Sequence, residues 1–154
     1  MLTIERAVFP AGIDEVLQLF REYAAELPFD LSFQGFEEEL ATLPGAYAPP
    51  RGCILLARGG RGAAGCVGLR PLGDDVCEMK RLYVRPKLRR RRLGRRLVLA
   101  VLGEARDIGY RRMRLDTVPS MARAIALYRA LGFHEIAPYT HSPVAGALFF
   151  ECRL

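Results

Sequence analysis

The sequence has no long apolar run. No window approaches the roughly 18–20 unbroken apolar residues that a membrane-spanning helix needs. Residues 1–6 lack both the basic start and the apolar stretch of a secretory signal peptide. These absences predict a cytoplasmic protein that makes no contact with a membrane. The length of 154 residues suffices for one domain with a hydrophobic core.

Residues that bind metals or form disulfides are scarce. The two histidines, His134 and His141, do not complete a metal-binding spacing, and no two of the four cysteines form a C-x-x-C pair. No metal is therefore expected. Three of the cysteines fall in apolar, strand-like runs, which favours buried and reduced thiols. The cysteines are Cys53, Cys66, Cys77 and Cys152.

Acidic residues are missing from the segment 80–96. Ten of the 23 basic residues lie in this segment, which leaves 13 basic against 17 acidic residues in the rest of the chain. The net charge of +6 is therefore concentrated, and the segment is expected to bind a polyanion with several phosphates. A nucleic-acid-binding protein is an alternative. It is disfavoured because Tyr83 is the only aromatic residue near enough to stack on bases.

Hydrophobic periodicity and turn residues divide the chain into strands and helices. Strands are expected at 2–9, 53–58, 64–71, 76–84, 113–117, 133–137 and 147–152. Helices are expected at 13–27, 33–43, 92–108 and 120–131. This order predicts an α/β (α+β) domain with a mixed, largely antiparallel twisted sheet of about six or seven strands, flanked by about four helices.

A βαβ-like crossover is expected from the strand at 76–84 through the helix at 92–108. A ligand is expected where this helix begins, beyond the carboxyl end of the strand at Val84. The first turn of a helix has unpaired backbone N–H groups and the positive end of the helix dipole, which together favour phosphate. Residues 91–93 include no Ser, Thr, Asp or Asn. The absence of a side-chain cap is consistent with a bound anion that accepts the hydrogen bonds of these N–H groups.

Two motifs resemble those of the GNAT superfamily, the acyl-CoA-dependent N-acyltransferases. The first family motif, Arg/Gln-x-x-Gly-x-Gly/Ala at a strand–loop–helix junction, aligns with Arg89-Arg90-Arg91-Arg92-Leu93-Gly94. The second is similar to residues 126–133, Ala-Leu-Tyr-Arg-Ala-Leu-Gly-Phe. The resemblance is good over residues 50–154, and it implies a single N-acetyltransferase domain over residues 1–154 with a GNAT-like sheet.

The resemblance implies that acetyl-CoA is the co-substrate. Its acetyl group would pass directly to a primary amine of a small molecule or peptide. The backbone of residues 82–84 would pair with the pantetheine arm, and one N–H group there would polarise the acetyl carbonyl. The residues implied in cofactor binding are Leu82, Tyr83, Val84, Arg89, Arg90, Arg91, Arg92, Leu93, Gly94, Arg95 and Met121.

Two catalytic roles are implied by the same resemblance. Tyr128 would be the general acid that protonates the coenzyme A thiolate, and the alternative is an aromatic residue of the core. Glu78 would be the general base that takes a proton from the amine, directly or through water. The alternative for Glu78 is a strand glutamate paired with a neighbouring arginine, in which case water is the base.

The sequence departs from the family pattern at two positions. Arg92 stands where the family has a glycine, which lets the backbone approach the pyrophosphate closely. An arginine in helical conformation would still present its N–H group. Met121 stands where many relatives have an asparagine that contacts the cofactor, and a thioether cannot donate that hydrogen bond. These departures motivate a second hypothesis, a catalytically degenerate module that binds acyl-CoA as a sensor or scaffold.

The sequence does not identify the acceptor amine. Its site is expected within residues 20–40 and 137–146, where the candidates are Tyr23, Phe29, Phe33, Tyr139 and His141. A drug, an amino acid, a polyamine and a protein amine all stay open. The oligomeric state also stays open, with a homodimer among the options.

Overall fold

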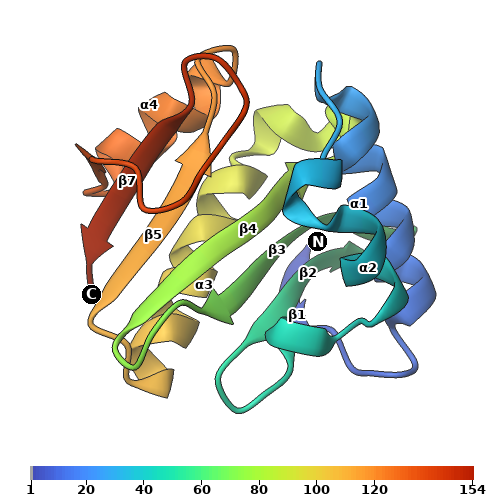
Figure 1. Ribbon diagram of the computed structural model, residues 1–154. Helices are drawn as coiled ribbons and strands as arrows, with labels where there is room; N and C mark the ends of the chain where they lie inside the picture. Colours follow the sequence, from blue (N-terminus) through green and yellow to red (C-terminus); the bar gives the residue numbers. More distant parts are fainter. Residues whose placement is uncertain (1) are drawn as a thin grey trace.

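The computed structural model describes residues 2–154 as a seven-stranded sheet with helices on both faces (Figure 1). The strands are β1 Thr3–Arg6, β2 Cys53–Gly59, β3 Gly62–Pro71, β4 Val76–Val84, β5 Arg112–Thr117, β6 His134–Ile136 and β7 Leu148–Arg153. The α-helices are α1 Ile13–Glu26, α2 Phe36–Ala41, α3 Leu93–Ile108 and α4 Ala122–Ala130. Short 3-10 helices cover Ser32–Gln34, Gly45–Tyr47 and Pro86–Arg91. The predicted fold class is confirmed.

The sheet runs in the order β1-β2-β3-β4-β5-β7-β6. Neighbouring strands are antiparallel except β4 and β5, which are parallel and joined by α3. The largely antiparallel sheet and its one βαβ crossover therefore agree with the prediction.

β4 and β5 pair only over their first three residues. Their register runs from Val76 and Arg112 to Glu78 and Arg114, and in the described structure both strands continue beyond this point without pairing with each other. The two strands separate toward their carboxyl ends, as Figure 1 shows. Side chains from both strands line the opening between them.

A β-bulge in β4 lies beside this opening. Lys80 pairs with Gly68 of β3, whereas Tyr83 pairs with Cys66, so β4 contains one extra residue over this stretch. Arg81, within the bulge, has a left-handed φ of 60°. Such a conformation is uncommon for a residue with a side chain, and it often marks a functional site.

Two apolar clusters hold the helices to the sheet. On one face, Leu97 and Val101 of α3 are fully buried against β2, β3 and β4, since the apolar residues of this helix recur at helical spacing. On the other face, Leu19 and Phe20 of α1 are fully buried with residues of α2. Each such side chain contributes about 1.5–3 kcal/mol on burial.

The predicted helix boundaries differ from the structure in two informative places. The helix expected at 33–43 is split, because Gly35 adopts a left-handed φ of 68° between the 3-10 helix and α2. The helix expected at 120–131 begins at Ala122, after Met121.

The four cysteines are buried and free, as predicted. Burial raises the pKa of the Cys53 thiol to about 11 and that of Cys77 to about 12, so both stay protonated.

Candidate active site

The junction between β4 and α3 differs from the prediction at Arg92. The helix was expected to include this residue, but Arg92 has φ 55° and ψ 26° and is the left-handed N-cap, with α3 beginning at Leu93. Glycine adopts this conformation without strain, which gives a physical reason for a glycine at this motif position. No side chain caps α3, so the amides of its first turn have no partner from a cap residue.

A groove of about 650 Å³ opens at this junction. It lies between the end of α1, the carboxyl end of β4 and the first turns of α3 and α4. Several residues predicted to bind the cofactor line it together, and these are Leu82, Tyr83, Val84, Arg89, Arg92, Gly94, Arg95 and Met121.

The other predicted cofactor residues lie elsewhere. Leu93 is fully buried in the core, so only its backbone could serve a ligand in the groove. The side chain of Arg91 is exposed and is not part of the groove lining. The side chain of Arg90 lies outside the described part of the structure.

The arginines of the groove differ in their partners. Arg89 donates to Glu26 at 2.5 Å and to the Val84 carbonyl oxygen at 2.8 Å, so its charge is partly compensated. Arg92 and Arg95 have no ion pair with any described residue and are exposed at the groove. The groove therefore combines free guanidinium groups with the positive end of α3.

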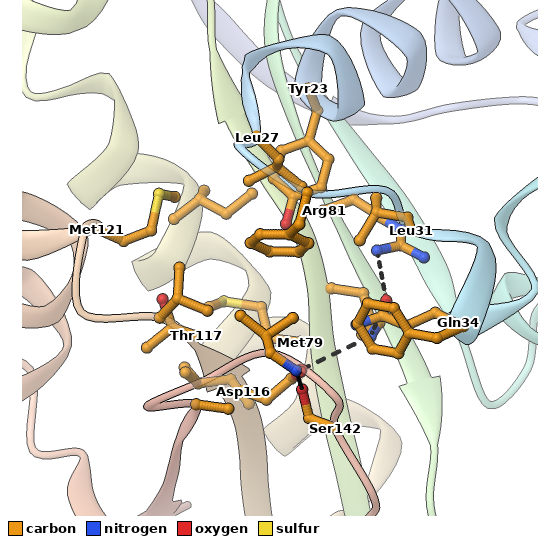
Figure 2. Close-up of a pocket in the computed structure, with 18 of the residues that line it drawn as sticks. Tyr23, Leu27, Leu31, Gln34, Met79, Arg81, Asp116, Thr117, Met121 and Ser142 are labelled. Carbon is orange, nitrogen blue, oxygen red and sulfur yellow. Dashed lines mark hydrogen bonds and ion pairs between the residues drawn. The ribbon is translucent and has the colours of Figure 1, made fainter.

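A small cavity of about 50 Å³ continues from the groove into the opening between β4 and β5. Tyr23, Leu27, Leu82 and Met121 line both spaces. Figure 2 shows how α1, β4, β5 and the residue before α4 surround this cavity, with Tyr23 and Leu27 facing Thr117 and Met121 across it. The groove and the interior of the sheet therefore communicate at the bulge.

Tyr128 reaches this cavity from α4. It is 6% exposed, and its ring packs against Phe133 with ring centroids 5.7 Å apart. Its hydroxyl has no hydrogen-bond partner among the described residues. Burial raises the pKa of Tyr128, so the hydroxyl stays protonated. Tyr128 is thus an aromatic residue of the core that also lines the cavity, and its role as the general acid stays a prediction.

A third space of about 330 Å³, here named the acceptor pocket, adjoins the cavity on the side away from the groove. Phe33, Gln34, Lys80 and Asp116 line both the cavity and this pocket. Of the residues predicted for the acceptor side, Phe33, Tyr139 and His141 line the pocket, whereas Tyr23 and Phe29 line the small cavity.

Glu78 lies in the acceptor pocket and is 2% exposed. Arg70 of β3 donates to its Oε1 through Nε at 2.8 Å and Nη2 at 2.7 Å. The Tyr139 hydroxyl donates to its Oε2 at 2.5 Å. The carboxylate is thus paired with a neighbouring arginine and also faces a cavity, so the structure combines features of both interpretations of this residue.

Two charged residues of β4 are placed differently from the sequence-based expectation. Lys80 and Arg81 were counted in the phosphate-binding segment, but both are buried, 7% and 3% exposed, and neither lines the groove. Arg81 is held by a bidentate contact with Glu39, at 3.0 Å for both bonds. Lys80 faces the acceptor pocket with Glu78, and burial lowers its pKa. Both lie inside β4, where all the other residues except Glu78 are apolar or aromatic, and this position within a strand was the available signal.

Two further absences are observed within residues 2–154. No group of three or more His, Cys, Asp or Glu side chains is arranged to hold a metal ion. None of the described helices has the length and apolar character needed to cross a bilayer.

Comparisons with known proteins agree with one another. The model of the acetyltransferase (GNAT) family matches residues 13–133. An uncharacterized N-acetyltransferase of Schizosaccharomyces pombe is 37% identical over 99% of this chain and 95% of its own length. A solved GNAT family acetyltransferase of Staphylococcus aureus has a TM-score of 0.80 at 18% identity, covering 99% of both chains. Another from Elizabethkingia anophelis, with acetyl-CoA bound, has a TM-score of 0.71 at 19% identity, covering 99% of this chain and 98% of its own.

Proposed function

The chain belongs to the acetyltransferase (GNAT) family, and we propose that it transfers the acetyl group of acetyl-CoA directly to a primary amine of a small molecule or peptide. One observation carries the proposal. The groove at the start of α3, the cavity beside Tyr128 and the acceptor pocket follow one another through the opening between β4 and β5. Two reactants that enter from opposite sides can therefore meet without a covalent enzyme intermediate.

Acetyl-CoA suits the chemistry of the groove. Its phosphates would be bound by the uncapped first turn of α3 and by Arg92 and Arg95. Its pantetheine arm would lie along the backbone of residues 82–84, where β4 no longer pairs with β5. Acetyl-CoA in the relative from Elizabethkingia anophelis supports the same ligand here.

The transfer needs a base, an oxyanion site and an acid. The protonated amine loses a proton to Glu78, directly or through water, and its neutral nitrogen then attacks the acetyl carbonyl. A backbone N–H group of residues 82–84 stabilises the negative charge that develops on the carbonyl oxygen. The C–S bond then breaks, and Tyr128 gives its proton to the departing thiolate. The nitrogen loses its second proton in this collapse, and that proton restores the Tyr128 hydroxyl, directly or through water. The products are the N-acetylated amine and free coenzyme A.

A two-part experiment tests this function. Thermal unfolding is measured with and without millimolar acetyl-CoA, and free thiol release is followed with a panel of primary amines. We expect a higher melting temperature with acetyl-CoA, because a ligand that binds only the folded state stabilises it. We also expect thiol release that depends on the amine. No thermal shift would contradict the proposal. A shift without release for any amine would favour the acyl-CoA-binding sensor or scaffold, which the left-handed Arg92 and Met121 motivate.

A further inference from the structure

The acceptor pocket contains a balanced set of charges. Arg70 and Lys80 contribute positive charge, and Glu78 and Asp116 contribute negative charge, from three adjacent strands β3, β4 and β5. Charged side chains are rarely buried unless paired. The hydrogen-bonding atoms of these four side chains therefore need partners, and the described residues supply only some of them.

The Lys80 ammonium has fewer partners than donors. An ammonium group carries three donors. Gln34 Oε1 accepts one at 3.0 Å, and Asp116 Oδ1 lies 3.7 Å away, which is long for a hydrogen bond. Gln34 and Asp116, both labelled in Figure 2, approach this ammonium from different elements. Because the side chain of Lys80 is only 6% exposed, the remaining donor capacity faces the cavities that it lines.

Arg70 and Asp116 also have atoms without a hydrogen-bond partner among the described residues. Arg70 uses Nε and Nη2 on Glu78, and its Nη1 has no hydrogen-bond partner in the described structure. Oδ2 of Asp116 likewise has no partner among the described residues, and its side chain is 17% exposed. Glu78, in contrast, accepts bonds at both oxygens. The pocket therefore offers spare donors on two cations and a spare acceptor on one anion.

We infer that the acceptor is a small amine that also carries a carboxylate group. This inference rests on the proposed function and specifies its substrate. The carboxylate would lie between Lys80 and Arg70, where its oxygens accept hydrogen bonds from the N–H groups of these residues that have no partner. The amine would lie toward Asp116, which lines both the pocket and the cavity that leads to Tyr128, and its proton would pass to Glu78 through water. A zwitterion matches the balanced charges, whereas a doubly charged phosphate would be repelled by Glu78 and Asp116.

The test compares amines in matched pairs that differ by the carboxylate. Glycine is compared with methylamine and β-alanine with ethylamine, and aminomethylphosphonate is included as the doubly charged analogue of glycine. We expect kcat/KM to be at least about tenfold higher for the carboxylate member of a pair, the size expected for one charge-assisted hydrogen bond. Equal values within both pairs, or a preference for the phosphonate, would overturn the inference.

Variants locate the effect. Lys80→Met removes the charge at similar length, and it should abolish the preference within the pairs while leaving the acetyl-CoA dissociation constant unchanged. Lys80→Arg should restore part of the preference. Arg153→Met, on the exposed end of β7, is the matched control and should change neither quantity. A preference that persists in Lys80→Met would show that another group binds the carboxylate.

A binding measurement without turnover separates this inference from the proposed function. Propionate, which has the carboxylate but no amine, should inhibit the wild type competitively against the amine and should lose this effect in Lys80→Met. If acetyl-CoA binds and amines without a carboxylate are acetylated equally well, only the inference fails. If acetyl-CoA does not bind, the proposed function itself fails.

Discussion

The Tyr139 hydroxyl donates a 2.5 Å hydrogen bond to Oε2 of Glu78, which ties the segment between β6 and β7 to the first part of β4. The ring of Tyr139 also packs edge-on against Phe149 of β7, with centroids 5.2 Å apart, and the Arg114 guanidinium lies over its face. Burial raises the pKa of Tyr139, and the neighbouring Glu78 acts in the same direction, so the hydroxyl remains a donor. This hydrogen bond therefore holds Tyr139 in place as part of the wall of the acceptor pocket.

Tyr139→Phe should loosen that wall. We expect KM for the amine to rise about tenfold, since a hydrogen bond to a charged group is worth about 1.5–3 kcal/mol. The dissociation constant of acetyl-CoA should not change, because Tyr139 does not line the groove. Tyr110→Phe is the matched control. Its hydroxyl donates to the Arg51 carbonyl oxygen at 2.7 Å, away from the site, so the same chemical change should leave KM unaltered.

Glu78→Gln tests the base. The amide keeps the shape of the side chain but cannot take up the proton, so kcat should fall by about 10²–10⁴. The control is Glu151→Gln on β7, a strand glutamate that Arg114 contacts at 2.9 Å, for which kcat should stay within a few-fold of the wild type. Equal small losses in both variants would assign proton removal to water and would leave Glu78 as the partner of Arg70.

Tyr128→Phe tests the acid. Because the hydroxyl has no partner among the described residues, its removal should change the free energy of unfolding by less than about 0.5 kcal/mol. The rate of thiolate departure should nevertheless fall, with kcat lower by about 10²–10⁴. Steady-state rates and urea unfolding of the same preparation separate the two effects. A variant with wild-type kcat would reduce Tyr128 to a packing residue.

Elements governed by local pattern could be predicted from the sequence. β4 has the predicted bounds, and α3 differs only at its first residue, since apolar spacing and flanking proline or glycine residues determine such segments. Part of the groove lining could be grouped in the same way, because residues 82–95 are close in sequence around one strand–helix junction. The residues that α1 and α4 add to the lining are distant in sequence.

The acceptor pocket could not be predicted in the same way. It depends on the strands β4 and β5 parting after Glu78 and Arg114, and on a bulge that changes the register with β3. Both are relations between paired strands, and the local pattern of a single segment reveals neither. The burial of Lys80 follows from them, so a lysine that seemed to belong to a basic surface segment is instead an interior residue with Gln34 and Asp116 beside it.

Lys80 should also make stability depend on pH. Burial lowers its pKa below the ordinary 10.5, so between the folded and unfolded values the unfolded state binds more protons. The free energy of unfolding contributed by this group therefore rises with pH in that window and levels off above about 10.5. Urea unfolding of the wild type and Lys80→Met from pH 7 to 11 should show a difference that shifts in favour of the wild type as the pH rises. A difference independent of pH would contradict the lowered pKa.

Two substitutions of Arg92 distinguish the effect of backbone strain from the effect of charge at the candidate phosphate site. Arg92→Gly removes the guanidinium group and suits the left-handed φ of 55°, whereas Arg92→Ala removes the guanidinium group but keeps the strain. We expect the glycine variant to be more stable than the alanine variant by about 1 kcal/mol in urea unfolding. Both should bind acetyl-CoA more weakly than the wild type at low salt, and this deficit should shrink as salt screens the charge. If instead the glycine variant binds acetyl-CoA more tightly than the wild type, the arginine side chain obstructs the diphosphate, and the site is held by backbone amides rather than by this guanidinium group.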